Sequence, residues 1–178
     1  MRRLLAVLAL SIAALAAIPA DAAQAPTALI GKPARARPPH RVPFPRIRDW
    51  NTLNISLVRT MCFGACPSYQ VEILGDGTIT WRGGRDVAVI GEASATIPKR
   101  DVRALYRAFR SADFFWLYDS YHAPITDLPT YTVTISYDGH VKAVEDYAGM
   151  SAGMPHSVSD LERLIDKTAN TARWIKAP

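Results

Sequence analysis

Alternation of apolar and polar residues is the feature that most restricts how this chain can fold. Tyr69, Val71 and Ile73 are separated by the polar residues of segment 69–73, and apolar and hydroxyl-bearing residues alternate in the same way over 131–137. A two-residue period puts one kind of side chain on each face of a strand. We therefore predict an antiparallel sheet with one face covered by a core and the other in water.

Turn signals divide the alternating segments into separate strands. Gly75-Asp76-Gly77 and Asp138-Gly139 combine residues that tolerate a positive φ, so each closes a tight hairpin. Another Gly pair, Gly83-Gly84, marks a third turn. The predicted strands are 54–59, 69–73, 78–82, 87–90, 131–137 and 140–147.

Two further segments have a helical period. A helix predicted to begin at Pro98 carries its apolar residues at i, i+3, i+4, i+7 and i+10, and a second helix is predicted from a capping box of Ser159 and Glu162. Four strands, a helix, two strands and a helix indicate an α+β domain, a single antiparallel sheet of about six strands with two helices on one face. The two apolar stripes are Val102, Leu105, Tyr106, Phe109 and Ala112, and Leu161, Leu164, Ile165 and Thr168.

The first 22 residues have the three parts of a secretory signal peptide. Arg2 and Arg3 form a basic start, Leu4 to Ile18 is an apolar run broken only by a serine, and Ala20-Asp21-Ala22 supplies small residues at a cleavage site. The apolar run has 15 residues, whereas a bilayer span needs roughly 20. We therefore expect residues 1–22 to be removed and the mature protein to be periplasmic or secreted, with no transmembrane segment.

A linker rich in Pro and Arg, residues 23–50, follows the predicted cleavage site. Its apolar residues follow no period, so no fixed structure is expected before about Trp50. Segment 30–50 has a net charge of +5, while residues 51–178 have a net charge of −1. The predicted domain, residues 51–178, is therefore not a basic nucleic-acid binder, and we expect it to be a monomer.

The two cysteines are the sharpest chemical feature. Cys62 and Cys66 are separated by three residues in a predicted loop, and paired thiols of an exported protein usually form a disulfide. Gly64 can adopt the positive φ that so small a ring requires. Copper-assembly proteins of the thioredoxin class also contain Cys-x-x-x-Cys-Pro, and thiolates favour Cu(I). A redox or Cu(I)-handling pair and two free structural thiols remain alternatives, although Tyr69 opens a predicted strand where those proteins have a helix.

The loop from Asp119 to Asp127 is the next candidate site, since it also contains Tyr121 and His122. His122 with either carboxylate could act as a general base or bind a metal ion. Turn formation by the two Asp side chains accounts for the same residues, and no further cluster with ligand spacing completes a metal site. An envelope hydrolase centred on His122 and Asp127 is the third hypothesis, and we expect no catalytic residue, metal or cofactor.

Aromatic residues offer one candidate interface. Consecutive bulky side chains at 114–117 cannot all enter a core, so Phe115, Trp116 and Tyr118 are candidates for contact with a partner. The leading hypothesis is an exported, non-catalytic domain that binds or modulates a partner in the cell envelope, either a protein or a glycan. The alternative is a thiol-based redox or Cu(I)-handling protein that uses Cys62 and Cys66.

Several short runs, spread over most of the predicted domain, carry a family resemblance. They are Arg59-Thr-Met-Cys-Phe-Gly-Ala-Cys-Pro-Ser-Tyr69, Gly75-Asp-Gly-Thr78, Ala112-Asp-Phe-Phe115, Asp119-Ser-Tyr121, Thr126-Asp-Leu-Pro-Thr130, Leu164-Ile-Asp166 and Arg173-Trp-Ile175. Together they resemble a bacterial family defined as a domain of unknown function, number 6438, over about residues 54–176. The resemblance supports the domain boundaries, and it implies no catalytic residue or ligand.

Overall fold

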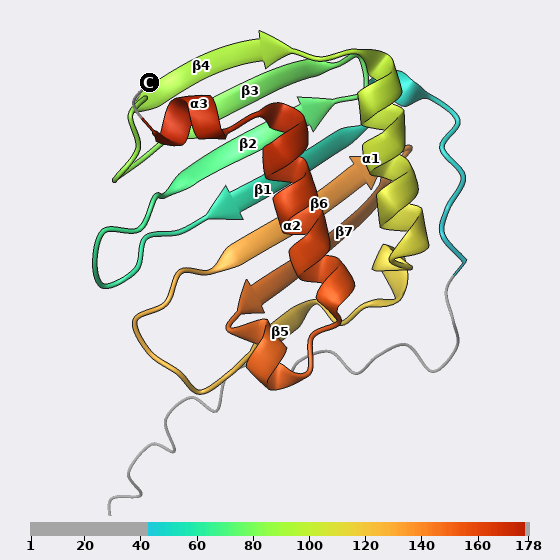
Figure 1. Cartoon of the computed structure of the whole chain (residues 1–178). Coiled ribbons are helices and arrows are strands. Elements are labelled where there is room, and N and C mark those ends of the chain that lie inside the picture. The colour runs from blue at the N-terminus through green and yellow to red at the C-terminus, as the bar shows by residue number, and fades with distance from the viewer. Residues whose placement is uncertain (1–42, 177–178) are drawn as a thin grey trace, which may run out of the picture. The chain divides into compact units, whose positions relative to one another are not determined.

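The computed structural model describes residues 43–176, which form one mixed sheet with helices packed on it (Figure 1). The strand order is β4-β3-β2-β1-β6-β7-β5. Neighbouring strands are antiparallel, except that β5 runs parallel to β7. The α+β class is confirmed. The sheet has seven strands where about six antiparallel strands were predicted, and the additional strand is the short parallel β5. The strands are β1 Asn54–Arg59, β2 Tyr69–Leu74, β3 Thr78–Gly83, β4 Gly91–Thr96, β5 Ser120–His122, β6 Tyr131–Tyr137 and β7 His140–Tyr147.

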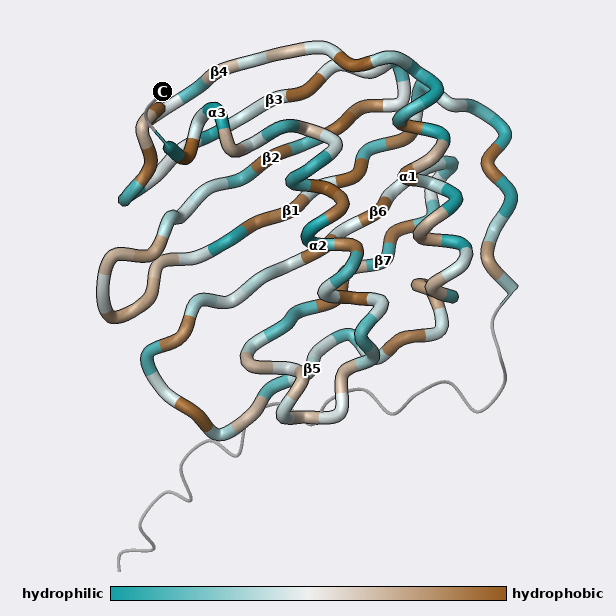
Figure 2. The backbone as a smooth tube through the Cα atoms, in the orientation of Figure 1, coloured by the Kyte–Doolittle hydropathy of each residue, from teal (hydrophilic) through white to brown (hydrophobic). Residues whose placement is uncertain are grey.

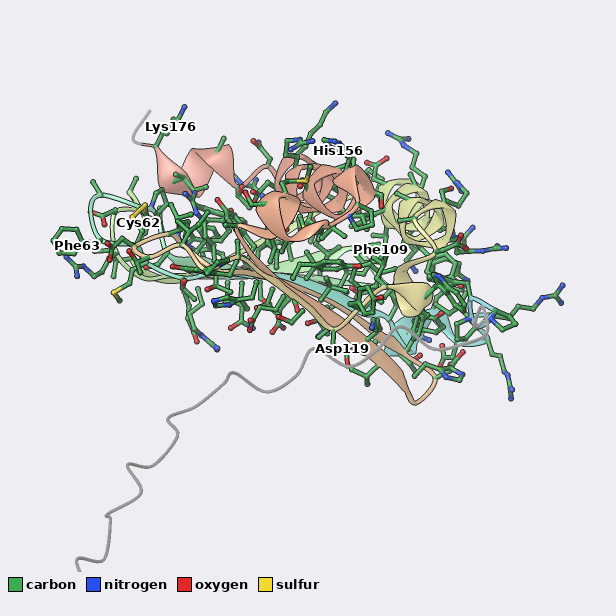
Figure 3. All side chains as sticks on the ribbon, turned by 90° about the horizontal axis from the view of Figure 1, so that it is seen from below. Cys62, Phe63, Phe109, Asp119, His156 and Lys176 are labelled. Carbon is green, nitrogen blue, oxygen red and sulfur yellow. A yellow bond between two sulfur atoms is a disulfide. The ribbon has the colours of Figure 1, made fainter. Side chains whose placement is uncertain are left out.

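The helices lie on one face of the sheet, as the view along the sheet shows (Figure 3). Apolar strand residues of alternate positions point toward them and are buried, and Figure 2 shows the same alternation as bands of colour along the strands. In the described part of the chain, no helix is both long enough and apolar enough to cross a membrane. The helices are α1 Lys99–Ser111, α2 His156–Ala169 and α3 Ala172–Ile175, with short 3₁₀ turns η1 Trp50–Thr52, η2 Phe114–Trp116 and η3 Gly149–Ala152.

Segment 87–90 is a loop and not the predicted fourth strand, which instead begins at Gly91. The backbone N–H groups of Ala88 and Val89 donate to the carbonyls of Ile175 and Trp174. Because this segment hydrogen-bonds to α3, its amides are not available to a sheet neighbour. The short strand β5 was missed because three residues are too few to show an alternation.

The second helix begins earlier than the predicted capping box. Pro155 precedes the first helical residue, His156, so Ser159 lies inside the helix. Pro has a fixed φ and no N–H to satisfy, which suits it to a helix start. Glu162 is buried, whereas a capping residue lies at the exposed start of a helix.

Residues 43–50 belong to the folded domain, which corrects the part of the predicted linker that the structure describes. The ring of Phe44 packs against those of Tyr106, Phe115 and Tyr137, with centroids 5.6, 5.0 and 6.3 Å away. The carbonyl of Pro45 accepts hydrogen bonds from the hydroxyls of Tyr106 and Tyr137, at 3.1 and 2.9 Å. Domain packing therefore begins before residue 51. The predicted signal peptide and the rest of the linker lie outside the described residues.

Candidate functional site

Four connections lie at one end of the sheet. One of them, 84–90, hydrogen-bonds to Ser68 and to α3, and we call the other three the loop end. They are segments 60–68, 123–130 and 148–155. Backbone hydrogen bonds hold the first two together, from Thr60 N–H to the carbonyl of Thr130 at 3.0 Å and from Phe63 N–H to that of Asp127 at 3.2 Å. The phenol of Tyr147, at the end of β7, accepts a 3.5 Å bond from the N–H of Leu128. The sheet thus fixes the relative position of loops that are far apart in sequence.

A disulfide between Cys62 and Cys66 closes the first of these loops. Gly64, inside the ring, has a φ of +144°, as predicted for so small a loop. Both cysteines are half-buried, whereas the side chain of Phe63 is 87% exposed and points away from the protein (Figure 3). The bridge therefore holds an aromatic side chain out in solvent.

Exposed apolar side chains gather at the loop end. Of the seven large hydrophobic residues that are exposed in the described chain, five lie in its three segments. These segments also contain a single charged residue, Asp127, in a chain with 21% charged residues. These three segments are consequently apolar with little charge, and Arg85 and Asp86 of segment 84–90 adjoin them at Ser68. The five residues are Met61, Phe63, Ile125, Leu128 and Met150.

Beneath the loops, a row of polar residues crosses the helix-covered face of four strands. The strand register places Arg59 opposite both Tyr69 on β2 and Tyr131 on β6, and Tyr131 opposite Asp146 on β7. The guanidinium of Arg59 lies 5.2 Å from the centre of the Tyr131 ring. On this face, each of the four strands therefore has a polar residue at the loop end, while its next position of the same phase is apolar.

One part of this row ties the sheet to the C-terminal helices. The hydroxyl of Tyr69 lies 2.9 and 2.8 Å from the two carboxylate oxygens of Asp166 on α2, and the hydroxyl of Thr171 donates to the same group at 2.8 Å. Burial raises the pKa of Asp166 despite these hydrogen bonds, and burial together with the negative Asp166 raises the pKa of Tyr69 well above its usual range. Tyr69 also stacks on Trp81, which stacks on Trp174.

The other part is a buried pair of carboxyl groups, Asp146 and Glu162, each in a residue that is 8% exposed. Asp146 Oδ1 accepts a 2.6 Å hydrogen bond from the N–H of Gly149. Burial and the adjacent Asp146 raise the pKa of Glu162 to about 8. Glu162 is therefore mostly protonated at neutral pH, and its Oε1 has no hydrogen-bond partner among the described residues.

A pocket of about 200 Å³ opens beside this carboxyl pair. Leu128, Pro129 and Met150 form apolar walls, and the polar lining residues are Tyr131, Asp146 and Ser151. Ligand sites combine apolar walls with a few polar groups, and at this volume the pocket is suited to a single side chain or a small molecule.

The backbone beside the pocket is specialised in two adjacent positions. A Cβ at Gly149 would lie 2.7 Å from Asp146 Oδ1 and 2.8 Å from Met154 Sδ, so a larger residue there would displace these two side chains. Ala148, which also lines the pocket, has a φ of +51°, a conformation that costs an alanine free energy. The pocket thus depends on a tight turn between β7 and η3.

The predicted site loop is spread out in the structure. Asp119 forms an ion pair with Lys142 of β7, and Tyr121 is buried, with its hydroxyl accepting the N–H of Tyr118. His122 is exposed and stacks on the ring of Tyr147 at 4.5 Å. The Asp127 carboxylate accepts a hydrogen bond from its neighbour Thr126. Within residues 43–176, no three His, Cys, Asp or Glu side chains are placed to hold a metal ion.

The run that contains the predicted interface residues is only partly exposed. Phe115, Trp116 and Tyr118 are all half-buried. Phe115 packs against Phe44, and Tyr118 packs against Tyr121 with ring centroids 5.7 Å apart. The strongly exposed apolar side chains therefore lie at the loop end and not in this run.

Sequence reasoning missed the polar row, although a signal for it exists. Arg59 shares the strand phase of the buried Leu57, and Asp146 shares that of the buried Val144. Glu162 follows the buried Val158 by four residues, which puts both on the same helix face. A charged residue in a buried phase is the pattern that would have identified the site.

The fold and the site together describe a small α+β domain with an apolar, disulfide-closed loop end above buried carboxyl groups. Residues 53–169 match the model of the family described as a domain of unknown function (DUF6438), and the chain belongs to this family. It matches none of the curated proteins with which it was compared. The runs that carried the sequence resemblance contain Arg59, Tyr69 and Asp166, so the structure brings distant parts of the family pattern into one polar row.

Proposed function

We propose that this protein is an exported, non-catalytic domain that binds a partner protein in the cell envelope through its loop end. The observation that carries the proposal is the gathering of exposed apolar side chains from three separate connections that together contain one charged residue. Contiguous exposed apolar surface on a folded protein marks an interaction site. The signal-peptide pattern of residues 1–22 supports the envelope as the place of binding.

The chemistry of the loop end favours a protein partner over a glycan. The cores of protein–protein interfaces are depleted in charge and enriched in aromatic residues and Met, which describes Phe63, Met61 and Met150. The disulfide between Cys62 and Cys66 limits the motion of the loop that carries Phe63, so less conformational entropy is lost when a partner binds.

A photo-crosslinking experiment in the native host tests this proposal. Phe63 is replaced by benzoylphenylalanine, which keeps an aromatic ring at the proposed contact, and Val141 is replaced in a matched control. Val141 is 68% exposed in the hairpin between β6 and β7, at the opposite end of the sheet. We expect residue 63 to give one discrete crosslinked envelope protein, identified by mass spectrometry, which residue 141 does not give.

The crosslink should also depend on the rest of the surface. Adding Leu128→Ser to the residue 63 probe is expected to weaken the crosslink, because Leu128 lies in the loop that is hydrogen-bonded to Phe63. Equal labelling from residues 63 and 141, or no labelling from 63, would show that the loop end does not bind a protein.

The exposure of the disulfide loop favours one second candidate, a thiol-based redox or Cu(I)-handling protein. Exposed disulfides are more readily reduced than covered ones, and Met61, beside Cys62, is itself exposed. Free thiols are counted on the folded protein before and after a mild reductant, followed by titration with Cu(I). Ready reduction without loss of structure, with stoichiometric Cu(I) uptake, would replace partner binding as the leading function. Resistance to the reductant supports a structural bridge.

A further inference from the structure

The pocket at the loop end contains negative charge that no described residue balances with an ion pair. Asp146 lines the pocket, and Glu162, which hydrogen-bonds to Asp146, has a buried Oε1 without a partner among the described residues. Neither residue forms a salt bridge with a Lys, Arg or His of segment 43–176. A buried carboxylate without a cation is costly unless a partner compensates it.

We propose that this pocket binds a Lys or Arg side chain presented by the partner protein, with the cation at Asp146 and the alkyl stem between Leu128 and Met150. The inference rests on the proposed function, since it assigns a chemistry to the partner's contact residue. Long basic side chains combine an apolar stem with a charged head. The pocket has the matching arrangement, because Leu128 and Met150 give it apolar walls and Asp146 is the one acidic residue in its lining.

A basic side chain fits this pocket better than a metal ion does. Metal sites use three or more converging ligands, and no such group exists in the described chain. One oxygen of Asp146 is already occupied by the N–H of Gly149. Asp146 also hydrogen-bonds to Glu162, but a carboxylate has about four acceptor positions. An organic cation needs only one of those still open and a low-dielectric surrounding, in which a charge-assisted hydrogen bond is strong.

Binding should be linked to the release of a proton. The charged groups that act on Glu162 are Asp146 of β7 and Asp166 of α2, which favour its protonated form, and Arg163 of α2, which opposes them. A cation at Asp146 offsets the negative field that holds the proton on Glu162, so Glu162 ionises when the cation binds. Affinity is therefore expected to rise with pH until Glu162 is already ionised in the free protein.

Small cations test the pocket directly on the purified protein, without the unknown partner. n-Butylammonium and n-butylguanidinium are titrated against 1-pentanol as a neutral control, and binding is followed by the NMR shifts of the Gly149 and Ser151 amides. We expect both cations to shift these amides at millimolar concentrations and 1-pentanol to bind at least tenfold more weakly.

Three variants sharpen the result. Asp146→Asn keeps the acceptor for Gly149 N–H and should weaken cation binding at least tenfold, while Glu162→Gln should retain binding and lose the pH dependence. Phe63→Ser lies outside the pocket and should leave cation binding unchanged, so failure of the loop-end crosslink and failure of cation binding are separate outcomes. Equal binding of 1-pentanol and the cations, no shift with either cation, or unchanged binding in Asp146→Asn would overturn the inference.

Discussion

The two ends of the sheet differ in what covers them. The hairpin end consists of the turns at 75–77 and 138–139 with residues 43–52 packed against them. There the Asp138 carboxylate accepts the backbone N–H groups of Arg48 and Asp49, and a Cβ on Gly75 would lie 1.6 Å from the carbonyl oxygen of Trp50. The loop end has no comparable segment over it among the described residues, and its apolar side chains meet solvent.

This difference separates structural from functional aromatic residues. Phe44 and Phe63 are both aromatic residues in irregular segments, and sequence alone does not distinguish them. Phe44 is half-buried and packs against other rings at the hairpin end, whereas Phe63 is held away from the core by a disulfide loop. Phe63 adds no packing to the core, yet its loop is held in a fixed position. An exposed aromatic residue of this kind is the better candidate for binding a partner.

Replacing Phe by Ala at each end of the sheet tests this difference, and it has the largest effect on stability that we expect. Phe44→Ala removes a half-buried ring from the aromatic cluster and should lower the free energy of unfolding by about 2 kcal/mol, less than a fully buried Phe would. Phe63→Ala removes an exposed ring and should change it by less than about 0.5 kcal/mol. Urea denaturation followed by tryptophan fluorescence measures both. A loss of more than about 1 kcal/mol from Phe63→Ala would mean that this residue stabilises the fold.

The response to pH also distinguishes the two ends. Glu162 has a pKa of about 8 in the folded protein and an ordinary, lower value when unfolded. Between these two pKa values the folded state keeps a proton that the unfolded state has lost. The free energy of unfolding is therefore highest below the unfolded pKa and decreases as the pH rises toward 8. The slope is at most about 1.4 kcal/mol per pH unit. Backbone N–H groups lower the pKa of Asp138, so its contribution is instead lost as pH falls below its ordinary range.

Denaturation at pH 6 and pH 7 measures this effect. Wild type should lose about 1 kcal/mol more than Glu162→Gln between these two values, because the variant has no proton to lose. Glu145→Gln is the matched control, since Glu145 neighbours Asp146 and is exposed. Equal pH dependence of wild type and Glu162→Gln would show that Glu162 is ionised in the folded state.

Much of the fold follows from local patterns, while the site does not. Strand β6 and helix α1 have the predicted positions because alternation and the 3.6-residue period report burial directly. The docking of Phe44 could not be predicted, since it depends on three residues distant in sequence and lies in a Pro-rich segment without a period. The polar row could not be predicted from the sequence for a related reason. Arg59, Asp146 and Glu162 become neighbours only through strand order and helix placement, which no single window of sequence contains.

The smallest expected effect concerns the turn that shapes the pocket. Ala148 has a φ of +51°, where its Cβ is strained and glycine is not, so Ala148→Gly should raise the free energy of unfolding by about 0.5 kcal/mol. Ala152→Gly, in the following turn η3, is the control. Ala152 does not have a positive φ, so its Cβ is not strained. Glycine there only adds flexibility to the unfolded chain and should lower the free energy of unfolding by about 0.5 to 1 kcal/mol.

The sign of the change in stability caused by Ala148→Gly is therefore the informative measurement. Both substitutions replace Ala by Gly, and they differ in the backbone conformation at the substituted position. If Ala148→Gly stabilises the protein and weakens n-butylammonium binding, then the strained alanine orders the pocket at the expense of stability, a combination typical of binding sites. If it destabilises the protein as much as Ala152→Gly does, then the turn at Ala148 carries no strain, and the loop end differs from the hairpin end in exposure alone.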